Sequence, residues 1–249
     1  MKLTAIVLTK DEEKNIGRCL EALRFCDEII VVDDGSQDST VKLAKKHGAN
    51  VYTRQLAGDF ASQRNFGLSK ASGEWVLFVD ADEVVGPKLK AEILHRLKTA
   101  KGVSGYKLKR YDRLWGKELK HGEIGAVRLL RLAKKDAGLW ARKVHEVWDI
   151  KGNIGELSTP LLHYPHQTLG EFIAETNFKS TMHAEANLSE GKRSSLLKVM
   201  FWPAGKFLNN YLLKLGFLDG TQGFIVAMVM SFHSFLAWGK LWLLQKKKD

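Results

Sequence analysis

The feature that most constrains the fold of this chain is the alternation of short apolar runs with helix-like segments in its first hundred residues. The runs LTAIVL at 3–8, EIIVV at 28–32 and WVLFV at 75–79 are apolar on both faces. Such strands, when helices separate them, are typical of a parallel sheet that is covered on both sides. The sequence therefore predicts an α/β fold with a doubly wound, mostly parallel sheet.

The segments between these runs carry helix signals. Helices are expected at about 12–24, 40–47, 59–71 and 87–98, from apolar residues at helical spacing. Ser39 and Thr40 suit the start of the second helix, Gly48 suits its end, and Pro87 suits the first turn of the fourth. A further strand, ANVYTR at 49–54, lies between two of the helices.

After residue 100 the pattern changes. The stretch 105–116 alternates like a strand of a mixed sheet, and the chain is helical from about residue 167. We expect one domain in two halves, residues 1–100 and 101–166, followed by a helical C-terminal region at 167–249. The first half is expected to bind a ligand, because ligands of doubly wound sheets bind beyond the carboxyl ends of the strands.

Acidic residues stand at those strand ends. Asp80 and Asp82 follow the WVLFV run, and in extended geometry their side chains leave on the same side. Two close carboxylates repel one another unless a proton or a cation lies between them. Mg²⁺ or Mn²⁺ is the natural partner, because hard divalent ions prefer oxygen ligands. The alternative is that DADEVVGPK at 80–88 only caps the next helix.

A second acidic site follows the EIIVV run. Within VVDDGSQDST at 31–40, Asp33 and Asp34 can accept hydrogen bonds from a nucleotide base or ribose. Asp38 and Ser39 are better explained by ordinary turn and cap chemistry. Arg64 supplies a cation that could lie over a diphosphate.

These blocks resemble the family 2 glycosyltransferases. The resemblance is carried by LTKDEEKNI, VVDDGSQDST and RNFGLSKASGEWVLFVDADE in that order, and it is strong over residues 1–100. It implies a GT-A fold with a DxD metal motif. The stretches KVHEVW, PLLHYPH and LKLGFLDGTQGF resemble more specifically the lipopolysaccharide core β-1,4-glucosyltransferase-like branch.

The resemblance also implies roles for single residues. Arg64 matches the basic residue near the diphosphate, Asp80 the carboxylate at the ribose and metal water, and Asp82 the direct metal ligand. The positions that match those holding uracil and ribose are Thr9, Asp11, Glu12, Asp33 and Asp34. The implied reaction is inverting transfer of a hexose from a nucleotide sugar, with UDP-glucose as the expected donor. Another hexose, or a heptose on ADP, stays open.

The general base is expected in the second half. Glu146 of VHEVW is the first candidate and His145 the second, because the usual pKa of histidine suits a base at neutral pH. The alternative is an ordinary strand with inward valines. His163 of HYPH could complete the shell of the metal, or it could be a structural histidine on a proline-shaped loop. A zinc site is not expected, since the histidine spacings match no compact zinc pattern.

The C-terminal region points to a membrane. LLKVMFWPAGKFLNNYLLKLGFL at 196–218 mixes large apolar groups with lysines, and 223–244 is about long enough to span a bilayer. An interfacial amphipathic helix, a spanning helix, and a soluble packing or dimer face are the three alternatives. The lysines near the C-terminus and the net charge of +11 favour an anionic surface.

The expected partners follow from these features. They are a nucleotide-sugar donor, a glycolipid acceptor and the anionic inner-membrane surface, with no nucleic acid, because no usual nucleic-acid motif is present. The N-terminus is expected to be a strand and not a signal peptide, which predicts a cytoplasmic protein, peripheral on the inner face of the membrane. A soluble or protein acceptor, and an inactive binding protein, are the alternatives. A nucleotidyltransferase is disfavoured, since no glycine-rich loop follows the first strand.

Overall fold

The chain forms two compact units in a computed structural model that describes residues 2–125, 127–143, 146–165 and 168–247. The first unit combines Met1–Arg110 with Val127–His163, and the second combines Tyr111–Ala126 with Tyr164–Asp249. Residues 111–126 thus leave the first unit as an excursion from the sheet and belong to the helical unit.

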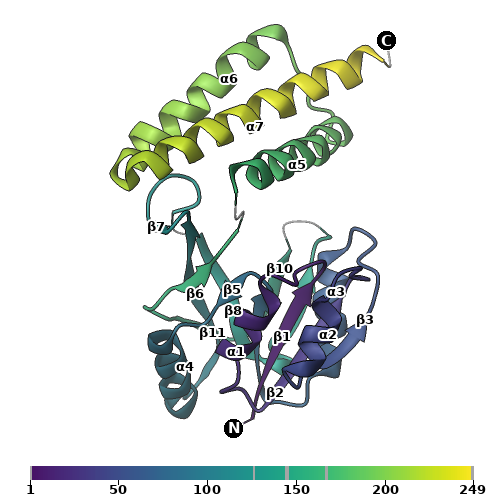
Figure 1. Ribbon diagram of the computed structural model, residues 1–249, viewed down its shortest axis with the longest axis vertical. Helices are drawn as coiled ribbons and strands as arrows, with labels where there is room; N and C mark the ends of the chain where they lie inside the picture. The colour runs from purple at the N-terminus through teal and green to yellow at the C-terminus, as the bar shows by residue number, and fades with distance from the viewer. Residues whose placement is uncertain (1, 126, 144–145, 166–167, 248–249) are drawn as a thin grey trace. The chain divides into compact units, whose positions relative to one another are not determined.

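The first unit begins with the expected strand and helix alternation (Figure 1). Its elements before residue 100 are β1 (Leu3–Thr9), α1 (Ile16–Ala22), β2 (Glu28–Asp33), α2 (Thr40–Lys46), β3 (Asn50–Thr53), α3 (Phe60–Lys70), β4 (Trp75–Asp80), β5 (Glu83–Val84) and α4 (Pro87–Thr99). The later elements are β6 (Val103–Leu114), β8 (Val127–Lys134), the 3₁₀ turn η1 (Lys135–Ala137), β9 (Gly138–Ala141), β10 (Val147–Ile150), β11 (Asn153–Glu156) and β12 (Leu161–His163).

The main sheet is parallel at one side and mixed at the other. Its strand order is β3-β2-β1-β4-β8-β6-β12-β5, and β1 pairs in parallel with both β2 and β4. The other side is mixed, since β8 pairs antiparallel with both β4 and β6 whereas β11 pairs in parallel with β6. The prediction of a doubly wound, mostly parallel sheet followed by mixed strands is confirmed.

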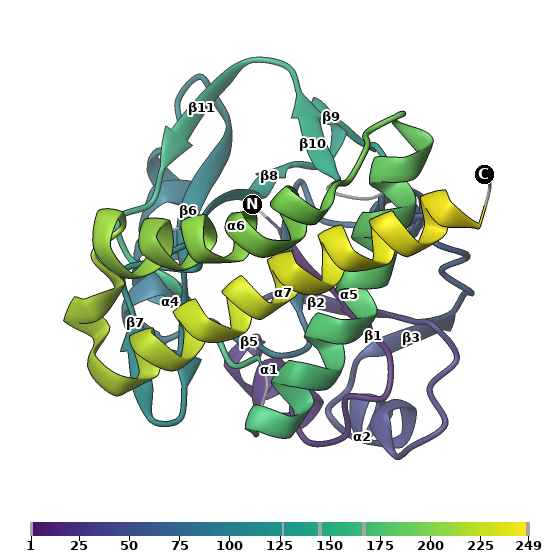
Figure 2. The same cartoon turned by 90° about the horizontal axis from the view of Figure 1, so that it is seen from above.

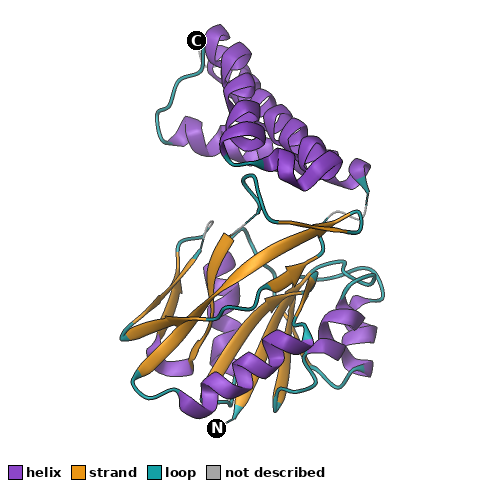
Figure 3. Ribbon diagram, turned by 90° about the vertical axis from the view of Figure 1, so that its left-hand side faces the viewer, coloured by secondary structure: helices purple, strands orange, loops and turns teal. Residues whose placement is uncertain are grey.

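Successive residues of the central strands enter two different cores. Helices lie on both sides of the sheet (Figure 3). In β4, Trp75, Leu77 and Val79 pack with α1 and α4, whereas Val76 and Phe78 pack with α3 and with the β9–β10 hairpin. All five side chains are fully buried. A strand that feeds two cores must be apolar at every position, which explains the unbroken run in the sequence.

The sheet register brings the acidic strand ends together. Thr9 at the end of β1 pairs with Asp33 at the end of β2, and Leu8 pairs with Asp80 at the end of β4. The chain turns at Ala81 and Asp82, directly after β4. Asp80 therefore ends its strand at the same sheet edge as Thr9 and Asp33, as the carboxyl ends of parallel strands require.

The second unit is mainly helical. It contains the end of β6, β7 (Lys117–Leu119), α5 (Leu169–Ser189), α6 (Leu196–Leu208), the π-helical turn η2 (Asn209–Leu213), the 3₁₀ turn η3 (Gly216–Asp219) and α7 (Gly220–Lys246). Figure 2 shows α6 and α7 lying side by side and α5 crossing α7. The core of the second unit contains Leu114, Leu119, Phe172, Val226 and Val229.

The stretch Gly216–Lys246, which includes α7, is long and apolar enough to cross a bilayer; within the described part of the chain no other helix is. Length and composition alone support this, and a helix from the core of a soluble protein can share both. One third of its most apolar stretch is buried inside the protein. Lys240, the charge inside this segment, is used within the fold, because its ammonium donates to Ser180, to Thr181 and to both oxygens of Asn177 on α5.

The close approach of α3 to the sheet yields a stability prediction. A Cβ on Gly67 would lie 2.7 Å from Ile6 Cγ2 and 3.2 Å from Val32 Cγ2. Gly67→Ala should gain about 1 kcal/mol of helix propensity but lose more through overpacking, which costs about 1–3 kcal/mol. We expect a net loss of unfolding free energy, measured by urea denaturation. Gly17→Ala in α1, where the new Cβ meets only His47 Nε2 at 3.5 Å, is the matched control and should be neutral or stabilising. An equally stable Gly67→Ala protein would contradict this packing.

Candidate active site

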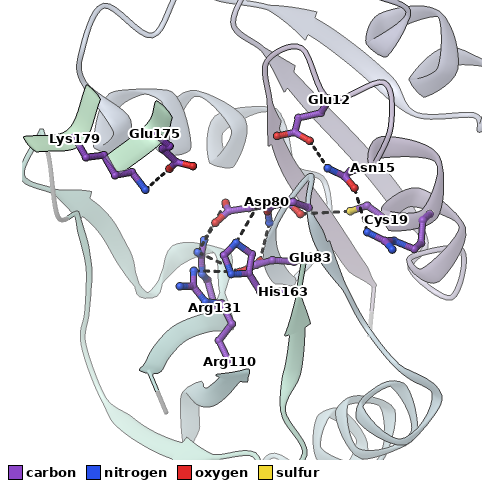
Figure 4. A network of polar contacts seen from close by, with 12 residues as sticks. Glu12, Asn15, Cys19, Asp80, Glu83, Arg110, Arg131, His163, Glu175 and Lys179 are labelled. Carbon is purple, nitrogen blue, oxygen red and sulfur yellow. Dashed lines mark hydrogen bonds and ion pairs between the residues drawn. The ribbon is translucent and has the colours of Figure 1, made fainter. Parts of the chain in front are cut away.

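Two arginines from different elements hold the carboxylate at the end of β4. Arg64 Nη2 on α3 lies 3.0 Å from Asp80 Oδ1, and Arg131 Nη2 on β8 lies 2.6 Å from Oδ2. Arg131 Nη1 adds a second bond to Oδ1 at 3.3 Å. Burial opposes ionisation of Asp80, but the charges of Arg131 and Arg64 hold its pKa well below the usual range. Asp80 is therefore an anion with a fixed orientation (Figure 4).

Glu83 stands behind Asp80 as a buried anchor. Its Oε2 accepts the backbone N–H of Asp80 at 2.8 Å, and its side chain is fully buried. Burial, with the charge of Asp80 as the second cause, raises the pKa of Glu83. Arg110 Nη1 and Arg131 Nη2 lie 3.7 Å and 3.8 Å from its Oε1. Glu83 thus fixes the backbone at the end of β4 and does not itself face a substrate.

Arg64 links the end of β4 to the second half of the sheet unit. Its Nε donates to Glu146 Oε1 at 3.0 Å, while its guanidinium lies 4.7 Å from the ring centre of Trp140. Helix α3 places it there: Asp59 caps this helix by accepting from the N–H of Ser62, so Arg64 sits in the second turn. Arg64 Nη1 is buried and has no hydrogen-bond partner among the described residues. A buried, unpaired N–H on a cation is suited to an anionic ligand.

Asp82 and His163 meet beside this cluster. The turn after β4 presents Asp82, and β12, which pairs with β5, ends at His163. His163 Nε2 lies 3.0 Å from Asp82 Oδ2, and both side chains are partly exposed. Among the described residues no group of three or more His, Cys, Asp and Glu side chains is arranged for a metal. Two protein ligands are nevertheless compatible with Mg²⁺ or Mn²⁺, which commonly fill their shell with waters and substrate phosphates.

The acids of the β1 and β2 exits mostly organise their own loops. Asp33 accepts from the N–H groups of Gly35 and Ser36 and from the Ser36 hydroxyl, which makes a tight turn. Asp34 accepts from Lys10 at 3.0 Å and from the N–H of Leu56 at 2.7 Å.

Two further predicted residues, Asp11 and Glu12, tie the loop after β1 to neighbouring segments. Asp11 accepts from the N–H of Gln37, and Glu12 accepts from the side chain of Asn15. Thr9 differs from them, because its hydroxyl is buried and has no hydrogen-bond partner among the described residues. Of the residues predicted to hold the uracil and ribose, Thr9 is therefore the one with an unsatisfied buried group.

The structure also contains site residues that sequence reasoning missed. Arg131 and Glu83 complete the cluster around Asp80, and Arg110 lies beside it. The available signal was Arg131 itself, a charge within the apolar strand sequence VRLLRLAK at 127–134. His145, the second predicted base, lies outside the described residues. The tryptophans Trp140 and Trp148 are core residues, stacked 5.4 Å apart.

Comparisons with known proteins agree with the sequence blocks. The family model described as "Glycosyl transferase family 2" matches residues 4–148. The lipopolysaccharide core biosynthesis glycosyltransferase LpsC of Rhizobium meliloti (strain 1021) is 30% identical, over 97% of this chain and 92% of that protein. An uncharacterized glycosyltransferase of Rickettsia typhi (strain ATCC VR-144 / Wilmington) is 27% identical over 96% of this chain and 86% of its own length.

Solved structures show weaker similarity. Residues 1–349 of Staphylococcus aureus TarS align with all of this chain and 92% of theirs, at 16% identity and a TM-score of 0.47. Glucosyl-3-phosphoglycerate synthase from Mycobacterium tuberculosis, in a complex with Mn²⁺, UDP and glucosyl-3-phosphoglycerate, aligns with 45% of this chain and 44% of its own, at 26% identity and a TM-score of 0.38. The family assignment depends on the sequence comparisons, which confirm the predicted resemblance, the GT-A fold and the glycosyltransferase activity. The chain belongs to glycosyl transferase family 2.

Proposed function

We propose that this glycosyltransferase is an inverting, metal-dependent enzyme that moves a hexose from a nucleotide sugar, expected to be UDP-glucose, to a lipid-linked saccharide. The observation that carries the proposal is the cluster around Asp80: an anion held by Arg64 and Arg131, with a buried, unpaired N–H on Arg64. Thr9 supplies a second buried polar group without a partner among the described residues, at the same sheet edge.

The proposed metal ligands are Asp82 and His163. A carboxylate oxygen and an imidazole nitrogen that already lie 3.0 Å apart form a donor set that suits Mn²⁺ or Mg²⁺. Both oxygens of Asp80 are committed to arginines, so its predicted role at the ribose and metal water fits better than direct ligation. When bound, the ion would stabilise the negative charge of the departing diphosphate.

The arginines have separate tasks in this proposal. Arg64 binds the diphosphate through its unpaired Nη1, which offers a cation already fixed before the substrate arrives. Arg131 acts through Asp80, because it holds both oxygens of that carboxylate and touches no ligand in the proposal. It is a positioning residue. The arginine charges also balance the carboxylate of Asp80, which lets this group remain ionised in a poorly solvated site.

Glu146 is the proposed general base. Its side chain is 18% exposed, so an acceptor hydroxyl can reach it, and Arg64 Nε holds its Oε1 in place at 3.0 Å. The same arginine thus contacts the proposed base and the proposed diphosphate site, which would hold acceptor and donor in one geometry. His145 is the alternative base.

The acceptor assignment rests on the sequence comparison and on the second unit. LpsC is named for lipopolysaccharide core biosynthesis, and it matches this chain over nearly the full length of both. The second unit exposes large apolar side chains on α6 and α7. We therefore propose a glycolipid acceptor and a cytoplasmic protein that is peripheral on the anionic inner face of the membrane.

The direct test is a panel of nucleotide sugars assayed for binding by thermal shift, with Mn²⁺ and with chelator. UDP-glucose with Mn²⁺ should raise the melting temperature, and a concentration of one hundred times Kd should add about 2.7 kcal/mol of stability. Transfer is then measured with lipid-linked core saccharide as acceptor. Binding without transfer to any acceptor would favour the inactive binding protein.

The metal proposal predicts the effect of removing one ligand. His163→Ala should weaken Mn²⁺-dependent binding of UDP-glucose tenfold or more in titration calorimetry, because a ligand of the ion is lost. His95→Ala, which removes an exposed histidine of α4, is the control and should bind as wild type does. Unchanged affinity of His163→Ala would exclude this histidine as a ligand.

The Asp80 cluster predicts a pH-dependent stability. Asp80→Asn leaves two arginines without their anion and should cost roughly 2–3 kcal/mol at pH 7, below the range of about 3–5 for fully buried pairs because Asp80 is 28% exposed. The folded-state pKa is depressed, so the contribution is complete above the unfolded value of about 3.9 and is lost as the pH falls below it. Urea unfolding at pH 7 and pH 3 should therefore show a smaller difference at pH 3. Asp136→Asn, at an exposed position, should show no such change.

The base proposal predicts a split between catalysis and binding. Glu146→Gln should lower kcat by a factor of about 10²–10⁴ while the Kd of UDP-glucose changes little, because glutamine can still accept from Arg64. His145→Ala is measured in parallel. If it loses the activity and Glu146→Gln does not, the roles of the two residues are exchanged.

A further inference from the structure

The α6–α7 hairpin exposes one continuous apolar face. Leu197, Phe201 and Leu208 on α6 are at least half exposed, and Met228, Phe232 and Phe235 on α7 are exposed as well. Their spacings of three, four and seven residues are those of one helix side. We call these six residues the apolar face. Further exposed large apolar side chains lie on α5, among them Ile173, Phe178 and Met182.

The helix contacts show that both stripes lie on the same side of the hairpin. The hydroxyl of Ser231 donates to the carbonyl of Pro203, and the rings of Phe207 and Phe224 lie 5.9 Å apart, so the helices are antiparallel. At 3.6 residues per turn, Leu208 is rotated by about +140° from Pro203, and Phe232 by about +100° from Ser231. Equal senses of rotation in an antiparallel pair point to one common side. The apolar face is therefore a single surface.

The polar contacts between α7 and α5 are incompatible with a membrane-spanning α7 in this fold. Lys240 donates to Ser180 and Thr181 on α5, and His233 stacks on His183 of the same helix at 5.6 Å. Helix α5 also carries ion-paired charges such as Glu175 and Lys179. A helix packed along such a partner cannot have lipid on all sides.

The positive charge of the α6–α7 hairpin indicates which kind of surface covers the apolar face. Among the described residues 191–247 the only carboxylate is that of Asp219, which is buried and binds His121. Two of its cations stand at the end of the hairpin where α6 begins and α7 ends: Lys198 lies 5.0 Å from the ring of Trp238 and Lys246 lies 4.7 Å from that of Trp242. Paired tryptophan and lysine side chains are typical of the headgroup layer. If a second copy of the chain covered this surface, the lysines of the two copies would face one another and repel.

We propose that the α6–α7 hairpin lies flat on a bilayer of anionic phospholipid, with the apolar face inserted into the headgroup and acyl boundary and α7 not crossing it. This deepens the membrane partner of the proposed function and rests on it. The chemistry is that of an interfacial amphipathic element, in which apolar burial and attraction to anionic lipid act together.

The test measures binding of the full chain to preformed vesicles. Sedimentation with phosphatidylcholine vesicles containing phosphatidylglycerol should exceed that with pure phosphatidylcholine and should fall as salt rises. The double variant Phe201→Glu/Phe232→Glu should bind at least tenfold more weakly. Phe178→Glu is the matched control, because Phe178 is 66% exposed but lies on α5. Equal loss in the control, or binding without dependence on anionic lipid, would overturn the proposal.

A second measurement separates lying flat from spanning. Single cysteines are placed near the two ends of α7 by Thr221→Cys and Lys247→Cys in a Cys26→Ser background, since Cys19 is buried. On vesicles, both should react with a membrane-impermeant thiol reagent added outside. Protection of one end would show that α7 spans.

One control distinguishes membrane binding from dimerisation through the apolar face, and a second separates it from the proposed donor binding. Light scattering without lipid should find the same mass for wild type and for the double variant; a wild-type dimer that the variant abolishes, together with no vesicle binding, would assign the face to a second copy. UDP-glucose binding with Mn²⁺ should be equal in all these variants. Its absence throughout, with vesicle binding intact, would contradict the donor proposal and leave the membrane surface standing.

Discussion

The ion pairs around Asp80 are the interaction on which the rest of the sheet unit depends. Asp80 ends a strand that is buried on both faces, and a carboxylate there is stable only because Arg64 and Arg131 approach it from α3 and β8. These contacts join the parallel half of the sheet to the antiparallel half, and Arg64 extends the connection to Glu146. The electrostatic balance that allows the site to exist therefore also determines how the halves meet.

Some charged residues of the site stabilise its loops, and others are available to bind a ligand. Asp33 and Glu83 are acids near strand ends, yet Asp33 Oδ2 and Glu83 Oε2 accept backbone N–H groups and shape the loops. Among the described residues, the buried atoms of the site without a hydrogen-bond partner include Arg64 Nη1, the Thr9 hydroxyl and Glu83 Oε1, and the Asp82–His163 pair lies beside this cluster. These, Glu83 apart, are the groups to which the proposed function assigns the donor and its metal. Rigidity comes from the acids that accept backbone N–H groups, and binding capacity from the groups assigned to the donor and its metal.

The helical unit follows a different physical rule. Its helices α5 and α7 bury small or polar side chains such as Ser180, Ala184 and Ala237, and α6 and α7 expose large apolar groups. For a protein in water alone this is unfavourable, since large apolar patches usually mark an interaction surface. Beside a bilayer the same distribution is favourable. The proposed acceptor, a lipid-linked saccharide, would be found on that surface.

The sequence by itself determined the doubly wound sheet, the order of its first helices, the acidic strand ends and the family, because unbroken apolar runs and short acidic motifs are local patterns. It also singled out Asp80, Asp82, Arg64, Glu146 and His163, which the structure brings together in two adjoining groups of contacts. Only the tertiary structure decided that Arg131 and Glu83 complete the cluster, and that the carboxylates of Asp11 and Asp33 accept hydrogen bonds from backbone N–H groups of the loops. Which partner a charge meets depends on contacts between residues that lie far apart in the sequence. The same is true of α7: its sequence is long and apolar enough to span a membrane, but only the tertiary structure shows that its Lys240 binds to α5.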